Sequence, residues 1–263
     1  MKRNINTDIN RVYISALDCY ENEKVQACLV PLLENMLNDN GIDKAALSGK
    51  KVVLKPNLLA KREADAGITA HPSFVAAAGK FFVELGAAVI IADSPGGVYN
   101  QGALEGIYKV TGMNDAAEKS GAVTNKDTDF VSVHEPDVSA LKFNIINPIN
   151  DADLIVNLAR LKTHALCEVS LAVKNMFGAI PGLQKAEQHA RFPKRMDFAD
   201  MLYQRTEGEM NLFADEHIKN IAFFYTKVFF KGARTVRFSD GGSRGNPGPS
   251  GIGYYMYLLC GFW

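Results

Sequence analysis

The chain has 263 residues, 47% of them hydrophobic, which suits a globular protein with one substantial core. Lysine plus arginine and aspartate plus glutamate both total 29, so no global basic field recruits nucleic acid. No run approaches the roughly 18 apolar residues of a membrane span, and the four cysteines form no CxxC pair. We therefore expect a cytoplasmic protein with reduced thiols, no metal site, no iron–sulfur motif, and neither nucleic acid nor membrane as a partner.

Short β-rich runs alternate with helical patterns in the first hundred residues. Strands are predicted at 11–17, 51–57 and 87–95, and helices at about 23–38 and 73–85. This alternation is typical of an α/β fold with a mostly parallel sheet and crossover helices.

The middle of the chain continues the pattern. Helices are predicted at about 101–111 and 114–119, followed by a strand pair in FVSVHEP and KFNIINP. LIVNLAR then reads as a fully buried strand, and VSLAVKNMFGAI as the helix after it.

Polar residues cluster at the carboxyl ends of the three clearest buried strands. They are Lys55 and Asn57 after VVL, Asp93 and Ser94 after VIIA, and Lys162, Thr163 and His164 after LIVNLAR. In open α/β sheets, ligands bind outside these ends, where the loops converge. One polar strand end is commonplace, but three together favour a binding site.

The residue types at these ends favour an anionic ligand. Lysines supply compact positive charge, and the SPGG turn at 94–97 supplies backbone N–H groups, which suits phosphate or carboxylate. Lys174 and Asn175 sit among apolar neighbours, and a buried lysine needs a partner. Either Lys162 and Lys174 clamp one anion together, or one of the two forms an ion pair with Asp153 or Glu168. No Walker loop and no GxGxxG motif is present.

Histidines raise two further possibilities. In AGITAHPSF, Thr69 or Ser73 is expected to cap a helix with Pro72 in its first turn, which leaves His71 to donate to a ligand or to move a proton. The HxxC spacing of His164 and Cys167 has too few partners to predict a metal site.

The motifs VVLKPNLL, ITAHPSFVAA, IADSPGG, LARLKTHALCEVSLAVKNMFGAIPG and KAEQHARFP together resemble the family called domain of unknown function 362, over about residues 11–203. The resemblance implies a cytosolic α/β protein without an established activity, often joined to a ferredoxin-type domain with two four-iron clusters. The family's motif positions fall on Lys55, Asn57, Asp93, Ser94, Lys162, Thr163, His164, Lys174, Asn175 and Gly178. No ferredoxin cysteine run exists here.

The sequence changes character after about Gln204. TVRFSDGGSRGNPGP is similar to the opening hairpin of ribonuclease H, at about 235–255, with Asp240 as its first metal-binding carboxylate. Nuclease activity is disfavoured, because two-metal hydrolysis needs several carboxylates and none follows Asp240.

We interpret the chain as an α/β domain at 1–204 and a divergent tail at 205–263, from a truncated or fused reading frame. A sheet that lacks its last strands exposes an edge, which favours a dimer. The aromatic runs IAFFYTKVFF and YYMYLLCGFW either cover that edge or fold poorly.

The sequence predicts a protein that binds a small anion at its strand ends, with no reaction assigned and its status as an enzyme open. Lys55, Lys162 and Lys174 would supply charge, Asn57, Ser94, Thr163 and Asn175 would orient the ligand, and Asp93 and His164 would act as acid or base. The alternative is a non-catalytic redox scaffold, which would dock an iron–sulfur partner of the ferredoxin type through the basic segment 185–195.

Overall fold

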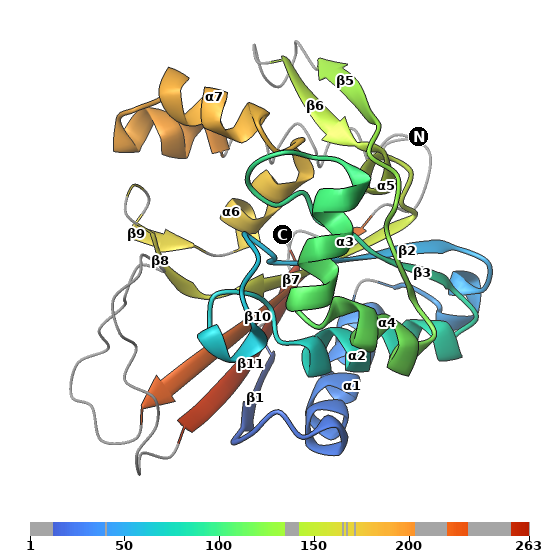
Figure 1. Ribbon diagram of the computed structural model, residues 1–263. Coiled ribbons are helices and arrows are strands. Elements are labelled where there is room, and N and C mark those ends of the chain that lie inside the picture. The colour runs from blue at the N-terminus through green and yellow to red at the C-terminus, as the bar shows by residue number, and fades with distance from the viewer. Residues whose placement is uncertain are drawn as a thin grey trace.

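A seven-stranded sheet forms the centre of the protein. Its strands are β1 (Tyr13–Leu17), β2 (Lys51–Pro56), β3 (Ala88–Ile91), β4 (Val123–Thr124), β7 (Leu154–Arg160), β10 (Asn220–Phe230) and β11 (Tyr254–Phe262). They lie in the order β1-β11-β10-β7-β2-β3-β4 (Figure 1). This computed structural model describes residues 13–39, 41–134, 142–164, 166, 168–170, 172–202, 220–230 and 254–262.

Five neighbouring strands of the sheet are parallel. β10, β7, β2, β3 and β4 run in one direction, whereas β11 is antiparallel to both β10 and β1. The predicted α/β class with a mostly parallel sheet is therefore confirmed, and the carboxyl ends of β2, β3 and β7 open on the same side of the molecule.

The helices are α1 (Asn22–Asp39), α2 (Pro72–Glu84), α3 (Gln101–Val110), α4 (Met113–Ser120), α5 (Asn147–Asn150), α6 (Ala172–Met176) and α7 (Gln184–Arg191). The predicted ranges of α1 to α4 agree with the structure to within one residue at each end. Asn100 caps α3, where its Oδ1 accepts from the Ala103 N–H at 2.8 Å, and Gly121 ends α4 in the left-handed conformation. Within the described ranges, no helix is long and apolar enough to cross a lipid bilayer.

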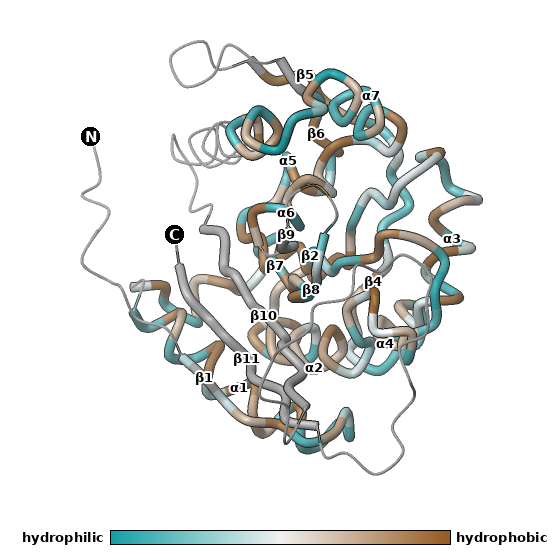
Figure 2. The backbone as a smooth tube through the Cα atoms, turned by 90° about the vertical axis from the view of Figure 1, so that its left-hand side faces the viewer, coloured by the Kyte–Doolittle hydropathy of each residue, from teal (hydrophilic) through white to brown (hydrophobic). Residues whose placement is uncertain are grey.

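Both faces of the sheet are covered, as the alternation of side chains in a strand requires. In Figures 1 and 2, α1, α2 and α4 lie on one side of the strands, and α5, α6 and α7 on the other. Val52 and Leu54 of β2 belong to the larger core cluster, whereas Val53 belongs to a second cluster on the α6 side.

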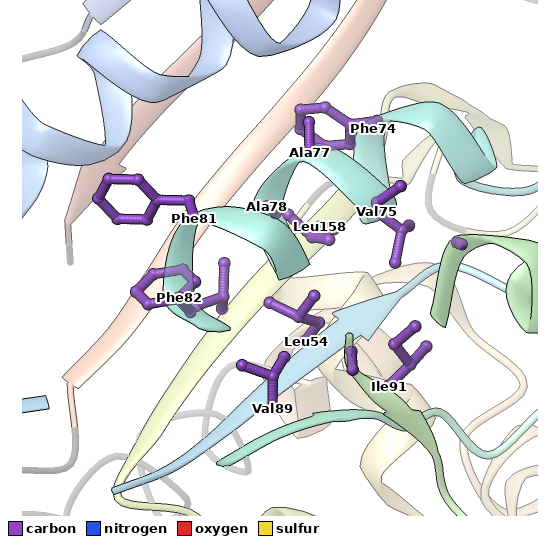
Figure 3. Close-up of a cluster of buried hydrophobic side chains, with 14 of the residues drawn as sticks. Leu54, Phe74, Val75, Ala77, Ala78, Phe81, Phe82, Val89, Ile91 and Leu158 are labelled. Carbon is purple, nitrogen blue, oxygen red and sulfur yellow. The ribbon is translucent and has the colours of Figure 1, made fainter. Parts of the chain in front are cut away.

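The α2 side of the sheet is the main hydrophobic core (Figure 3). Phe74 and Phe82 of α2 are 1% and 0% exposed and pack with Leu54, Val89 and Ile91 of the strands. Burial of each phenylalanine contributes roughly 1.5–3 kcal/mol. This packing fixes β2 and β3, whose ends carry the candidate site.

Two short antiparallel pairs lie outside the main sheet. β5 (Phe130–His134) pairs with β6 (Lys142–Ile146), as predicted, and β8 (Lys162–His164) pairs with β9 (Glu168–Ser170). The helix predicted from VSLAVKNMFGAI is wrong in extent: its start is in β9, α6 has five residues, and a 3-10 turn at Phe177–Ala179 replaces its end. The main chain at 168–170 pairs with β8 instead, and the turn brings Gly178 against the sheet.

Both aromatic runs of the C-terminal segment form strands of the main sheet. β10 adds to β7 and β11 joins β10 to β1. The ribonuclease-H-like hairpin, including Asp240, lies outside the described residues apart from 254 and 255. The boundary predicted near residue 204, the truncated or fused reading frame and the dimer stay predictions.

Candidate functional site

The carboxyl ends of β2, β3 and β7 bring the predicted polar residues together. Lys55 belongs to β2, Asp93 and Ser94 follow β3, and Lys162 follows β7. Residues far apart in the sequence meet here, because parallel strands end at one edge of the sheet.

Lys55 and Asp93 form a buried ion pair at the floor of the site. The Lys55 Nζ donates to Asp93 Oδ1 at 2.7 Å, and the Leu58 N–H donates to Asp93 Oδ2 at 3.0 Å. Lys55 is 0% and Asp93 3% exposed. A buried charge needs such compensation. Lys55, predicted as a ligand contact, and Asp93, predicted as an acid or base, therefore neutralise each other's charge. This pairing favours a structural role for both residues.

Three asparagine side chains connect the sheet to α6. Asn175 Oδ1 accepts from Asn57 Nδ2 at 2.9 Å, and Asn175 Nδ2 donates to Asn157 Oδ1 at 2.6 Å. Asn157 Nδ2 in turn donates to the Ala172 carbonyl at 3.1 Å. All three amides are buried, so this network holds α6 over the strand ends. Sequence reasoning missed Asn157, although a lone asparagine within the apolar run LIVNLAR was a usable signal.

Lys162 differs from Lys55 because its partners are neutral. Its Nζ donates to Asn57 Oδ1 at 2.7 Å and to the Ile68 carbonyl at 3.0 Å, and among the described residues it forms no ion pair. Burial lowers the Lys162 pKa to about 8, together with the positive charges of Arg160, Lys174 and Lys55. The ammonium thus stands in a net positive surrounding that Asp93 offsets only in part.

Two buried threonine hydroxyls belong to residues that are chain neighbours of Lys162 and of its partner Ile68. Thr163 follows Lys162 in the chain, and Thr69 follows Ile68, whose carbonyl Lys162 binds. Both Oγ1 atoms are buried and have no hydrogen-bond partner. An unsatisfied buried hydroxyl costs roughly 1–3 kcal/mol, so a ligand oxygen beside either one would stabilise the site.

Lys174 and His164 lie on the α6 side of the site. The Lys174 Nζ is 4.1 Å from the centroid of the Phe177 ring and 4.9 Å from that of Phe198, in cation–π geometry. Burial, then Lys174 and Lys162, lower the pKa of His164. Its Nδ1 accepts from the Leu166 N–H at 3.2 Å, so neutral His164 carries its proton on Nε2 and presents a donor there.

The predicted SPGG turn is held against the segment that follows α6. The Ser94 N–H donates to the Gly178 carbonyl at 2.9 Å. Lys185 of α7 donates to the Ser94 carbonyl, and its Nζ lies 3.2 Å from both Ser94 Oγ and the Pro95 carbonyl. The ammonium of Lys185 therefore fixes this loop, and Lys185 is only half exposed.

The basic segment 185–195 divides into inward and outward parts. Besides Lys185, His189 is turned inward and stacks on Phe198 with ring centroids 4.3 Å apart. Burial and Lys174 lower the pKa of His189 to about 4, so it adds no charge near pH 7. Arg191, Lys194 and Arg195 are exposed. The docking role of the segment stays a prediction, and these three residues are its exposed cations.

The expectation for the start of α2 is wrong. His71, rather than Thr69 or Ser73, is the N-cap: its Nδ1 accepts from the Ser73 N–H at 3.2 Å, with Pro72 in the first turn as predicted. An imidazole nitrogen can accept this bond as a serine oxygen does. His71 also stacks on Tyr20, whose hydroxyl accepts from Arg160, so sequence reasoning missed two residues near the strand ends.

Within the described part of the chain, no three His, Cys, Asp or Glu side chains cluster closely enough to hold a metal ion. Cys19 and Cys28 are free thiols. Asp153, the alternative partner for a lysine of the site, lies instead 3.4 Å from the Nζ of Lys50 and accepts from the Lys51 N–H at 2.8 Å. Cys167 and the Glu168 side chain lie outside the description.

The chain is similar in sequence to a curated protein from a cyanobacterial strain. The thylakoid-associated protein sll1697 of Synechocystis sp. is 30% identical over 194 residues, which are 72% of this chain and 57% of that protein. The chain thus spans a little over half of the relative's length.

Two solved structures have more distant similarity. A Thermotoga maritima protein aligns with a TM-score of 0.48 at 13% identity, over 84% of this chain and 54% of its own. A lactate racemase apoprotein from Thermoanaerobacterium thermosaccharolyticum aligns with a TM-score of 0.43 at 18% identity, over 78% and 48%.

The profile of the domain of unknown function 362 (DUF362) matches residues 52–235, a range that includes the strand-end residues of β2, β3 and β7 and also covers β10. The match begins and ends later than the resemblance predicted from the motifs. The chain belongs to the DUF362 family.

Proposed function

We propose that this protein binds a small anion, a phosphate or a carboxylate, at the carboxyl ends of β2, β3 and β7, with Lys162 as its main charge partner. One observation carries the proposal. The ammonium of Lys162 is half-buried, and its hydrogen bonds within the described ranges go to the neutral oxygens of Asn57 and Ile68. Withdrawing a cation from water without a counter-charge is costly, and an anionic ligand removes that cost.

The surroundings of Lys162 support the same reading. Lys174 and Arg160 both act on its pKa as nearby positive charges, whereas Asp93 is already paired with Lys55. The buried hydroxyl of Thr163 and the Nε2–H of neutral His164 are donors suited to anion oxygens. The proposal concerns binding, and it assigns no acid or base.

The test is anion affinity in the Lys162→Met variant, which keeps much of the apolar stem and removes the charge. We expect inorganic phosphate or acetate, whichever binds the wild type, to bind the variant at least about tenfold more weakly, because a charge-assisted contact is lost. Isothermal titration calorimetry measures the difference.

Lys80→Met is the matched control for that test. Lys80 lies on α2 and makes a surface ion pair with Glu84 at 3.8 Å, so its loss should leave anion affinity unchanged. Equal affinity of the wild type and Lys162→Met, with both proteins folded, would contradict the proposal.

A further inference from the structure

Arg160 is a second cation near the site, and no described residue supplies it with a counter-charge. It is the last residue of β7, two positions before Lys162, and its side chain is half-buried. Its Nη1 donates to the Tyr20 hydroxyl oxygen at 3.1 Å, and in the described part of the chain it makes no ion pair. A guanidinium carries five N–H donors, so the phenol leaves most of its donor capacity available.

Tyr20, the hydrogen-bond partner of Arg160, is itself held in place by contacts with His71. The Tyr20 ring stacks on the His71 ring with centroids 3.7 Å apart and an interplanar angle of 11°. His71 is itself fixed as the cap of α2. Burial, then the charge of Arg160, lower the pKa of His71 to about 4, so the stack is neutral near pH 7 and does not compete for an anion. The guanidinium is therefore oriented without being neutralised.

Lys162 and Arg160 are anchored by different groups. Asn57 and Ile68 hold the ammonium, whereas Tyr20 holds the guanidinium. Because each cation is held by its own set of neutral partners, a ligand with two anionic groups gives each half-buried charge its own counter-charge.

We propose that the ligand of this site carries two anionic groups, one bound by Lys162 and the other by Arg160. The proposal rests on the proposed function and adds a ligand class to it: a small dicarboxylate or a phosphorylated carboxylate. Arg160 is then the residue that selects a ligand with two anionic groups over a ligand with one.

The experiment compares matched probes on the full chain by titration calorimetry. One pair is butyrate and succinate, and the other is methyl phosphate and phosphoglycolate. We expect the wild type to bind the second member of at least one pair about tenfold or more tightly than the first. Arg160→Met should lose this preference while its affinity for the probe with one anionic group stays within about twofold, because Lys162 still holds that group.

Two further variants sharpen the result. Arg160→Lys keeps the charge and should retain part of the preference. Tyr20→Phe removes the oxygen that orients Arg160. The preference for two anionic groups should therefore decrease, while the probe with one anionic group binds as before. Thermal unfolding of each variant checks that it is folded, and a purely structural role of Arg160 would not change the ratio of the two affinities.

The outcomes separate this inference from the proposed function. A wild-type preference that survives in Arg160→Met overturns the assignment of Arg160. Equal weakening of both probes in that variant shows a single anionic group shared by both cations, and also overturns it. If no probe binds the wild type, the proposed function itself fails and the inference fails with it.

Discussion

Replacing Lys55 with methionine is expected to destabilise the protein by about 3–5 kcal/mol, the usual cost of removing one partner of a buried ion pair. Lys55 is fully buried, and its loss leaves the carboxylate of Asp93 with the Leu58 N–H as its remaining hydrogen-bond donor among the described residues. Since native domains are stable by only about 5–15 kcal/mol, urea denaturation should show a large decrease in the unfolding midpoint.

Lys50→Met is the control for this substitution. Lys50 precedes β2 and pairs with Asp153 at 3.4 Å near the surface, so its removal should cost about 0–1 kcal/mol. The double variant Lys55→Met/Asp93→Leu should recover much of the stability, because it removes both charges. If Lys55→Met keeps wild-type stability and loses anion binding, Lys55 is a ligand contact rather than a structural partner.

Gly178→Ala is expected to destabilise the protein by at least about 3 kcal/mol. A Cβ built on Gly178 overlaps Asp93 Oδ1 and lies 2.5 Å from Lys55 Nζ, so the methyl group and the ion pair cannot occupy the same space. The Gly178 main chain cannot easily retreat, because its carbonyl accepts from the Ser94 N–H. Denaturant unfolding, together with the midpoint of anion binding, measures the effect.

Gly102→Ala is the matched control. Gly102 lies in α3, and the nearest atom to an added Cβ is Asn100 Oδ1 at 3.9 Å, an ordinary contact. Alanine should therefore stabilise the helix by about 0.5–1 kcal/mol. A Gly178→Ala protein as stable as the wild type would mean that the Lys55–Asp93 pair is not packed against this turn.

The sequence predicted the convergence of the strand-end residues better than the contacts that each of them makes. Strand periodicity located the ends of β2, β3 and β7, because buried parallel strands read as continuous apolar runs that end in polar residues. The structure brings Asn57, Asp93 and Lys162 together at these ends, as predicted. The ion pair between Lys55 and Asp93 depends on the register of β2 and β3. No local sequence pattern specifies that register.

Other features depend on contacts between distant segments. The sequence did not predict that His71 caps α2 and stacks on Tyr20. The stacking depends on the approach of the β1–α1 loop to the start of α2. Arg160 resembled an ordinary strand end. No described residue gives Arg160 a counter-charge, and this shows only when the neighbouring elements are in place. The pairing of β8 with β9 escaped prediction for the same reason, because it depends on contacts between separate segments.

The most direct test of the anion site is a crystal of the protein soaked in selenate, an oxyanion whose selenium scatters anomalously. The account predicts an anomalous peak beside the strand ends, with a selenate oxygen about 2.7–2.9 Å from the Lys162 Nζ. Ordered crystals with selenate peaks elsewhere on the surface, and none at Lys162, would contradict it.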